Sequence, residues 1–415
     1  MKTMTLTRAR ALAVALGMIA MSACDLTVTN PGPVQDQYLD DKAAIPSIVN
    51  GAGRDLAEAL NWTAYTGAAV AREIFPGGST GSFGISVNWQ NGKLTEEETD
   101  VHWNRAQRAR WTAEHGGERL RAVLGADFAT SKDAAQILLW AGYANRMLGE
   151  NFCQGVIDGG APQDFKVYFT RADAAFTEAI AVATAAGNVP IATAARAARA
   201  ATRLDLGQYT QAAADASGIA DAFVYTMPYN TTEQDTWNRI YWSTANQPYR
   251  AHTVWNTYYD GYYTNTKDPR VPWGSDPKQP VGDGAVGSLG QVPWHFEMKY
   301  TKKESAINLS TGWEMRLIEA EAKLNAGDLT GAMTSLNKHR LALSLAPWSA
   351  TAVDEAWVAL KRERGIELWL EGRRLGDFRR WSVANRPGAS DDMTGRDLCF
   401  TTPLSEKQTN PNFLP

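Results

Sequence analysis

The sequence predicts a mainly α-helical protein made of tetratricopeptide-like helical pairs with long irregular insertions. Several long stretches carry apolar residues at three- and four-residue spacing, which is the period of one helix face. Two turns between such stretches hold a glycine followed five residues later by an alanine, the offset of the tetratricopeptide turn. Between Tyr225 and Tyr300 the periodicity disappears, and aromatic residues and prolines become frequent. We therefore expect a helical platform with long excursions rather than a continuous solenoid.

The first 23 residues are typical of a lipoprotein signal peptide. An apolar run from Ala11 to Met21, too short to span a bilayer, follows a positive region formed by Lys2, Arg8 and Arg10. Met21-Ser22-Ala23-Cys24 then resembles a bacterial lipobox, which predicts cleavage before Cys24 and lipidation of its thiol. Simple secretion is the alternative. Asp25 leaves open which membrane receives the protein, because an acidic residue there resembles an inner-membrane retention signal of enteric bacteria.

After the signal peptide (1–23), residues 24–415 are expected to form a single domain. Residues 24–40 are polar and punctuated by prolines, as a tether between an anchor and a domain should be. The expected segments after it are N-terminal and first tetratricopeptide-like helices at 41–225, an aromatic-rich excursion at 226–311, C-terminal tetratricopeptide-like helices with a charged signature at 312–381, and a tail at 382–415.

Glycine turns place the helical pairs. Gly207 is followed by Ala212, and Gly327 by Ala332. In such a turn the glycine lets two antiparallel helices approach, and the small residue seats one helix against the other. Gly149 gives a weaker third copy. These glycines are too far apart for a regular array, so insertions must separate the pairs.

Charged residues and large apolar residues are interleaved in residues 361–381, KRERGIELWLEGRRLGDFRRW, which we call the signature. Glu363, Glu367 and Glu371 recur every four residues, so on a helix they would repel one another unless cations intervene. We expect the arginines of this segment to hold the carboxylates. Gly372 and Gly376 are expected to mark the end of the helix.

The charged residues of this segment follow an ordered motif. It reads Glu363-Arg364, Glu367-Leu368, Glu371-Gly372, Arg374, Asp377 and Arg379-Arg380-Trp381. A helical pair at 313–340 precedes it, and a tail with Pro403-Leu404-Ser405-Glu406 and Asn410-Pro411-Asn412 follows. In this order, the three stretches resemble the SusD/RagB family of bacterial outer-membrane nutrient-binding lipoproteins. The resemblance implies a SusD-like fold.

The resemblance also implies a function. The protein would be lipid-anchored in the cell outer membrane and face the exterior. It would bind oligosaccharides, or peptides, and pass them to a SusC-like TonB-dependent transporter, without a cofactor and without catalysing a reaction. Two alternatives stand beside this interpretation: a glycoside hydrolase of helical fold, and a tetratricopeptide scaffold that binds only protein.

Composition and motifs argue against several other classes of protein. Lys+Arg 41 and Asp+Glu 45 give a net charge of −4, which disfavours a nucleic-acid partner. The five histidines form no paired metal motif, and no phosphate-cradling glycine loop occurs, so we expect no metal and no cofactor. Gly77-Gly78-Ser79-Thr80-Gly81 fits G-x-S-x-G but lacks the strand and helix that a nucleophile elbow needs. The 45 acidic residues leave a glycosidase-type carboxylate pair open.

Aromatic side chains are the expected ligand surface, since sugars lie with their C–H faces on aromatic planes and arginine can hydrogen-bond their hydroxyls. Most rings of the excursion are expected to pin it to the helical platform, which leaves a few exposed. We predict that 226–311 is the ligand-binding excursion. The predicted ligand residues are Trp62, Tyr65, Arg72, Trp237, Trp242, Trp255 and Tyr259.

Cys153 and Cys399 are the cysteines left once Cys24 is lipidated. Outside the reducing cytosol a nearby pair tends to be oxidised, and two cysteines permit one pairing. We expect a disulfide between Cys153 and Cys399 that ties the tail to the early helices. Two separate buried thiols are the alternative.

Overall fold

The computed structural model describes residues 36–245, 249–387 and 393–413. The predicted signal peptide and Cys24 lie outside the described residues. The chain divides into two units after Ala44, and the first unit contains η1 (Asp36–Asp40) and η2 (Lys42–Ala44). The second unit begins at Ile45 and holds every element discussed below. Along the described ranges, no helix has the length and apolar character needed to cross a membrane.

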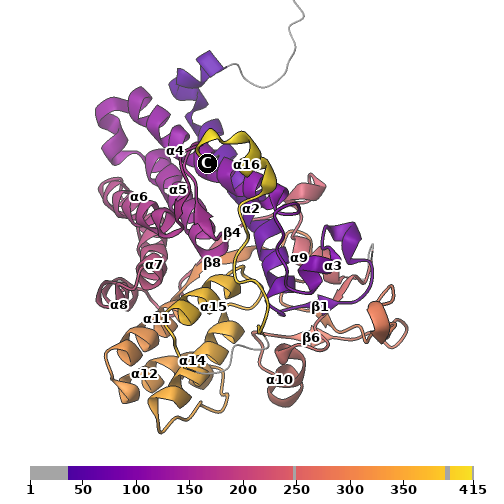
Figure 1. Ribbon diagram of the computed structural model, residues 1–415. Helices are drawn as coiled ribbons and strands as arrows, with labels where there is room; N and C mark the ends of the chain where they lie inside the picture. Colours follow the sequence, from indigo (N-terminus) through magenta and orange to yellow (C-terminus); the bar gives the residue numbers. More distant parts are fainter. Residues whose placement is uncertain (1–35, 246–248, 388–392, 414–415) are drawn as a thin grey trace, which may run out of the picture. The chain divides into compact units, whose positions relative to one another are not determined.

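Helices that follow one another in the chain pack side by side in the first half of the second unit (Figure 1), α2 on α4, α4 on α5, α5 on α6 and α6 on α7. Small alanines such as Ala172 and Ala194, both fully buried, let these helices approach closely. The elements of this half are α2 (Ile45–Val70), η3 (Thr80–Phe83), α3 (Val87–Gln90), α4 (Asp100–Leu124), η4 (Gly125–Thr130), α5 (Lys132–Asn151), β2 (Gln154–Gly155), β3 (Gln163–Asp164), α6 (Lys166–Ala185), α7 (Val189–Asp205) and α8 (Tyr209–Ser217).

A two-stranded sheet closes the excursion at its base. β4 (Val224–Met227) pairs antiparallel with β8 (Ile307–Thr311), so the chain leaves and re-enters the helical stack at one place. α11 (Gly312–Asn325) starts directly after β8 and packs on α8. The helices that follow are α12 (Leu329–Leu336), α13 (Lys338–Ala342), α14 (Val353–Glu367), α15 (Arg374–Val383), α16 (Leu404–Thr409) and η7 (Pro411–Phe413). The prediction of a mainly helical protein with helical pairs and long insertions is confirmed.

The predicted turns at Gly207 and Gly327 are confirmed. Their φ angles, 75° and 81°, are left-handed, and each glycine separates two packed helices, α7 from α8 and α11 from α12. The predicted turn at Gly149 is wrong, because Gly149 lies inside α5. There the Phe169 ring approaches to 2.7 Å from where a Cβ would stand, so the glycine serves helix packing. The third turn is at Gly187, between α6 and α7.

Short contacts pin the excursion to the first helical region. β5 (His252–Thr253) pairs with β1 (Phe75–Pro76), which follows α2. α9 (Arg239–Thr244) packs on α2, and Figure 1 shows the excursion beside α2 and α3. Its other elements are η5 (Gln234–Thr236), α10 (Tyr258–Thr266), β6 (Trp273–Gly274), η6 (Gly287–Leu289) and β7 (Phe296–Glu297). Trp242, which lies on α9, is therefore brought to the side of α2.

α14 ends at Glu367, earlier than the two glycines of the signature predict. Gly372 lies in the turn between α14 and α15, with φ 73°. Gly376 lies inside α15, where the carbonyl oxygen of Glu150 would be 3.0 Å from a Cβ. Gly376 therefore permits close packing of α15 on α5 and does not end a helix.

The glutamates of the signature bind the excursion. The Arg270 guanidinium donates to Glu363 at 2.6 Å and to Glu367 at 2.8 Å. The Lys299 ammonium donates to Glu371 at 2.7 Å. The prediction that arginines of the signature itself hold these carboxylates is wrong, because Arg270 and Lys299 lie in the chain between α10 and β8, and the further cation on Glu363, Arg340, lies on α13.

The arginines of the signature instead join helices to one another. Arg364 on α14 donates twice to Asp377 on α15, both times at 2.9 Å. Arg373 lies 2.9 Å from Glu150 of α5 and 2.9 Å from Glu314 of α11. All five residues are buried, so the signature is a buried network of ion pairs that connects four helices.

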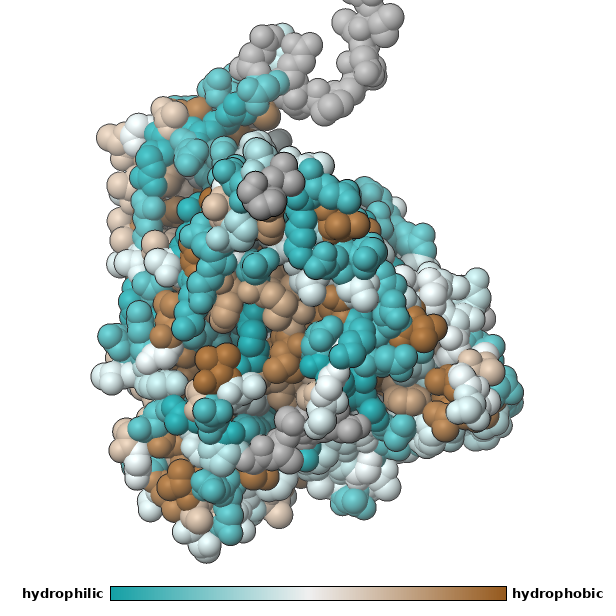
Figure 2. Space-filling view, in the orientation of Figure 1, coloured by the Kyte–Doolittle hydropathy of each residue, from teal (hydrophilic) through white to brown (hydrophobic). Residues whose placement is uncertain are grey.

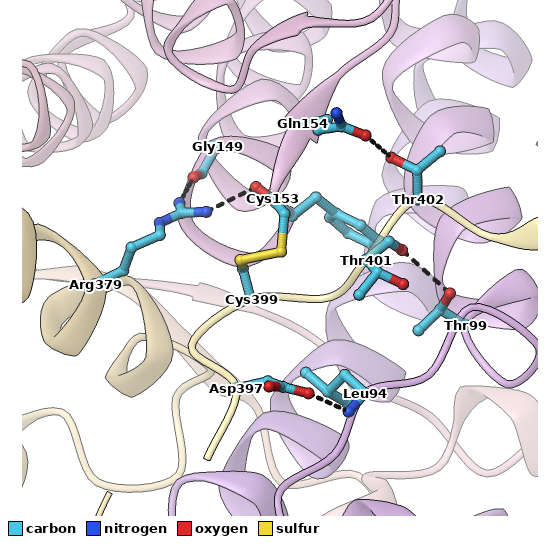
Figure 3. The surroundings of a disulfide bond; sticks show 11 residues. Leu94, Thr99, Gly149, Cys153, Gln154, Arg379, Asp397, Cys399, Thr401 and Thr402 are labelled. Carbon is cyan, nitrogen blue, oxygen red and sulfur yellow. Dashed lines mark hydrogen bonds between the residues drawn. A yellow bond between two sulfur atoms is a disulfide. The ribbon is translucent and has the colours of Figure 1, made fainter. Parts of the chain in front are cut away.

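The C-terminal tail returns to the early helices (Figures 1 and 3). Cys399 is bonded to Cys153, just beyond the end of α5. Beside the disulfide, the backbone N–H of Cys153 donates to the Phe400 carbonyl at 2.9 Å, and the Phe400 N–H donates to the Asn151 carbonyl at 2.7 Å. In Figure 3, Arg379 of α15 donates to the carbonyl of Gly149 on the same helix end. The tail is thus fastened to α5 by backbone hydrogen bonds as well as by the disulfide.

Candidate functional site

On the face drawn in Figure 2, hydrophobic side chains occur in separate groups among hydrophilic ones. Hydropathy alone therefore does not mark a ligand surface on that face. In the structure the predicted ligand residues lie in two separate places. Trp62, Trp237 and Trp242 lie together, and Tyr65 lies beneath them. Arg72 and Tyr259 line a cavity, and Trp255 directly precedes the lining residue Asn256.

The first group, which we call the tryptophan cluster, consists of Trp62, Phe83, Trp237, Trp242 and Tyr249. Trp237 and Trp242 meet edge to face with ring centroids 5.2 Å apart. Phe83, at the end of η3, contacts Trp242 at 5.1 Å and Tyr249 at 5.9 Å in the same manner. The tryptophans are half-buried and Tyr249 is exposed. Half-buried rings that neighbours hold in place provide a rigid stacking surface.

Arg239 joins Trp62 to the rest of the cluster. Its guanidinium lies 3.5 Å from the centroid of the Trp62 ring and donates to the Phe83 carbonyl at 2.6 Å. The Lys303 ammonium lies 3.5 Å from the centroid of Trp237. Burial lowers the pKa of Arg239 to about 10, so the guanidinium stays charged at neutral pH. The cluster therefore combines apolar ring faces with hydrogen-bond donors.

Tyr65 is not part of this surface. It is fully buried, its ring packs edge-on against Phe83, and its hydroxyl lies 3.2 Å from Nδ1 of His252. Burial raises the pKa of the Tyr65 hydroxyl well above its ordinary value. The prediction that Tyr65 contacts a ligand is wrong because η3 and β5 cover the ring, which supports the cluster from below.

The second group surrounds a cavity of about 350 Å³, which we call the arginine pocket. Its walls come from the end of α2, from the start of α10 and from the signature helices α14 and α15. The lining consists of Ala71, Arg72, Asn256, Thr257, Tyr258, Tyr259, Arg362 and Arg374. Among these described lining residues, three are arginines and none is acidic.

Two wall residues of the arginine pocket have left-handed backbones, Arg72 with φ 60° and Asn256 with φ 59°. The Arg72 guanidinium donates to the Asn256 carbonyl at 2.9 Å. Residues other than glycine seldom adopt this conformation, and those that do concentrate at functional sites. Trp255 is not a lining residue: its ring packs edge-on against Phe75, with the centroids 5.7 Å apart, and the Phe75 ring lies 5.4 Å from the Arg72 guanidinium.

Tyr259 is 3% exposed, so its ring offers no face for a sugar. Its hydroxyl donates to the Gly365 carbonyl at 3.1 Å, and its ring packs against Trp369. The prediction of a stacking role is wrong because Tyr259 anchors α10 to the signature. The neighbouring Tyr258 is half-buried and lies 4.2 Å from the Arg362 guanidinium.

Several residues of the two groups were missed at the sequence level, namely Phe83, Arg239, Tyr249, Tyr258, Lys303, Arg362 and Arg374. Arg374 is a motif position and Arg362 lies within the signature, so the motif itself carried a signal for the pocket. Phe83 is a large ring in a glycine-rich stretch, which indicates a packing or binding contact. Tyr258 is one of the aromatic residues of the excursion, whereas we find no sequence signal for Arg239. Throughout the part of the chain that the structure describes, no group of three or more His, Cys, Asp or Glu residues could hold a metal ion.

Comparison with known proteins agrees with this fold. Residues 221–413 match the model of the SusD family. A SusD superfamily protein from Bacteroides thetaiotaomicron is similar with a TM-score of 0.64 and 14% identity, over 91% of this chain and 98% of that one. Surface glycan-binding protein A from Bacteroides uniformis is similar with a TM-score of 0.64 and 13% identity, over 90% and 99%. A SusD-like carbohydrate binding protein from Bacteroides vulgatus has a TM-score of 0.57 and 14% identity, over 81% and 83%.

A search of curated proteins finds no match to the sequence. At these low identities the solved structures establish the fold, which extends over about nine tenths of the chain. The family match covers the signature and the helical pair before it, where the sequence motif lies. The family match favours the predicted binding protein over the glycoside hydrolase. Residues 221–413 therefore match the SusD family, and about nine tenths of the chain has the SusD-like fold.

Proposed function

We propose that this protein binds oligosaccharides at the outer surface of the cell and passes them to a SusC-like TonB-dependent transporter in the outer membrane. The tryptophan cluster is the observation that carries the proposal. Two solved structures of the same fold support it, since one is named a surface glycan-binding protein and the other a carbohydrate binding protein.

The geometry of the cluster fits a sugar chain that turns. The planes of Trp237 and Trp242 are 79° apart, so a ligand that lies on both rings must change direction between its sugars. This favours flexible or curved oligosaccharides over flat, extended chains. Arg239 and Lys303 place donors beside the rings, where sugar hydroxyls can accept hydrogen bonds.

Attachment and delivery complete the proposal. Lipidation of Cys24 would hold the protein at the outer membrane, and residues 24–40 would act as the tether. The transporter would then receive ligand from a protein that stays at the membrane, which raises the local ligand concentration at its mouth. These steps rest on the lipobox and on the family match over residues 221–413.

A glycan and peptide array probed with the purified full chain tests the proposal. Trp242→Ala should weaken binding by about 2 kcal/mol or more, or about thirtyfold, because a central ring is lost. Trp111→Ala is the matched control, since Trp111 is 51% exposed on α4 and outside the cluster.

The outcomes separate the possibilities. Glycan binding that falls in Trp242→Ala and persists in Trp111→Ala supports the proposal. Equal glycan binding by both variants would show that the cluster is not the site. Binding of peptides alone, or of nothing on the array, would show that the proposed ligand class is wrong.

A further inference from the structure

We propose that a second cavity, which we call the aromatic pocket, binds the ammonium group of an amino sugar, so that the protein selects glycans that contain amino sugars. This inference rests on the proposed function and adds a ligand class to it. The aromatic pocket shares no residue with the tryptophan cluster or with the arginine pocket.

The aromatic pocket has a volume of about 410 Å³, and all of its walls belong to the excursion. They come from α9, from the loop after β6, and from β7 with the chain before it. The lining consists of Tyr241, Thr244, Ala245, Ser275, Asp276, Pro277, Trp294, Phe296 and Glu297. Among these described lining residues, three carry aromatic rings, two are acidic and none is basic. Aromatic rings attract a cation to their negatively charged faces, which is how aromatic cages recognise ammonium groups.

The rings of the aromatic pocket are fixed in place. The indole N–H of Trp294 donates to the Thr244 carbonyl at 3.1 Å, and its ring packs against Phe296 with the centroids 4.9 Å apart. Trp294 is buried, whereas Phe296 and Tyr241 are half-buried and present part of their surface to the cavity. Rings that are already ordered lose little entropy when a ligand binds.

Asp276 brings the negative charge to the aromatic pocket. Its half-buried carboxylate accepts a hydrogen bond from the backbone N–H of Lys278 at 2.9 Å. Within the described ranges no side-chain cation forms an ion pair with this carboxylate. The second acid, Glu297, is buried, and burial raises its pKa to about 8, so near neutral pH it is mostly protonated and serves as a hydrogen-bonding group.

Two cations near the aromatic pocket are bound to other groups. Lys299, close to Glu297 in the chain, donates to the Glu371 carboxylate at 2.7 Å. The Arg250 guanidinium lies 5.8 Å from the centroid of the Trp294 ring and donates to the Val281 carbonyl at 3.0 Å. Neither cation lines the cavity, so the space beside Asp276 is open to the cation of a ligand.

The size and the hydroxyl groups of the aromatic pocket favour a sugar as the carrier of the ammonium group. A cavity of about 410 Å³ is at the small end of ligand pockets, which suits one sugar unit. The hydroxyls of Tyr241 and Ser275 form no hydrogen bond within the described part of the chain, so both can bind sugar hydroxyls. Tyr241 also directly precedes Trp242 on α9, so one helix carries a ring of the aromatic pocket and a ring of the tryptophan cluster.

Calorimetric binding of four defined probes to the full chain tests this inference, at a slightly acidic pH that keeps the amines protonated. The chitosan trisaccharide, the chitin trisaccharide and cellotriose have one backbone and differ only in carrying an ammonium, an acetamido or a hydroxyl group. N-acetyl-trilysine places the same number of ammonium groups on a peptide. Because each probe is short, it can fill the aromatic pocket without reaching the tryptophan cluster.

Two variants and two controls accompany the probes. Asp276→Asn removes the charge and keeps an oxygen that accepts from the Lys278 N–H, and Tyr241→Leu removes a ring while keeping an apolar side chain. Asp354→Asn is the control for charge, because Asp354 is exposed in the first turn of α14. Trp111→Ala is the control for an aromatic ring outside the pocket.

We expect the unmodified protein to bind the chitosan trisaccharide about tenfold more tightly than the other three probes. Asp276→Asn should remove this advantage and leave the binding of the two uncharged trisaccharides unchanged. Tyr241→Leu should weaken binding of the chitosan trisaccharide about fivefold, and the controls should bind like the unmodified protein. Raising the salt concentration should weaken binding of the chitosan trisaccharide alone among the three sugars, a readout that needs no variant.

A chitosan trisaccharide that binds no more tightly than the chitin trisaccharide or cellotriose would overturn the inference. Equal binding of N-acetyl-trilysine would overturn it by assigning the aromatic pocket to peptides, and an equal loss in Asp354→Asn would show that only the overall charge of the protein matters. Each of these results leaves the proposed function standing if other glycans on the array bind in a way that depends on Trp242. Failure of these probes and of the whole glycan array would overturn both.

Discussion

Asp377→Asn is expected to destabilise the folded protein by about 3–5 kcal/mol, because it leaves a buried arginine without its charge partner. Arg364 is 2% exposed and donates twice to the Asp377 carboxylate at 2.9 Å, and Arg380 donates to the same group at 2.8 Å. Asparagine keeps the shape of the side chain but loses the negative charge. Its amide group also places donors where the two guanidinium groups need acceptors.

Urea unfolding followed by tryptophan fluorescence measures this cost. Asp354→Asn is the matched control: Asp354 is exposed in the first turn of α14, where its charge contributes only about 0.3–1 kcal/mol through the helix dipole. If Asp377→Asn lowers the urea midpoint no more than Asp354→Asn does, the signature is not the network that connects these helices.

The Asp377 carboxylate also makes the stability of the folded protein depend on pH. Burial alone would raise the pKa of Asp377, but the charges of Arg364 and Arg380 outweigh it and lower the pKa. The stabilisation is therefore present above the unfolded pKa of about 3.9 and is lost as the pH falls through the lower folded value. Between about pH 4 and pH 2 the unmodified protein should lose more stability than Asp377→Asn.

Three further predictions test other parts of the structure. Cys24→Ser should leave the protein unlipidated and outside the detergent phase of the membrane fraction; partitioning like that of the unmodified protein would contradict the lipobox. Glu297 is buried, and burial raises its pKa from 4.5 to about 8, so stability should fall as the pH rises between these values. Glu297→Gln should flatten that pH dependence in urea-unfolding curves, and an unchanged slope would show that the carboxyl does not titrate there. Cys153 and Cys399 should resist thiol labelling in the unfolded, unreduced protein, whereas two labelled thiols would show that no bridge forms. Breaking the bridge by Cys153→Ser should cost at most roughly 5 kcal/mol, the chain-entropy value for so long a loop.

The helices and their turns could be predicted from the sequence, because helix periodicity and turn residues depend on residues close together in the chain. Glycine at a left-handed turn and alanine five residues later identified Gly207 and Gly327. The same offset links Gly187 to Ala192, so applying it along the whole chain would have found the third turn and excluded Gly149. Whether a glycine ends a helix or lies inside one, by contrast, depends on packing against distant segments, as for Gly149, which lies inside α5 against Phe169.

The ligand surface was predictable only in part, because burial is decided by segments far apart in the sequence. Trp62 and Tyr65 are neighbours on α2, yet β5 and η3 cover Tyr65 and leave Trp62 half-buried. Tyr258 and Tyr259 are adjacent on α10, yet the signature buries Tyr259 more deeply. Spacing along one helix cannot show which of two rings a distant strand will cover.

A crystal structure of the full chain with the oligosaccharide that binds best on the array tests the proposed function most directly. We predict a sugar ring stacked on Trp237 or Trp242, with a hydroxyl of the ligand accepting a hydrogen bond from Arg239 or Lys303. A sugar bound away from the tryptophan cluster, at a surface that includes none of its rings, would contradict the proposed site.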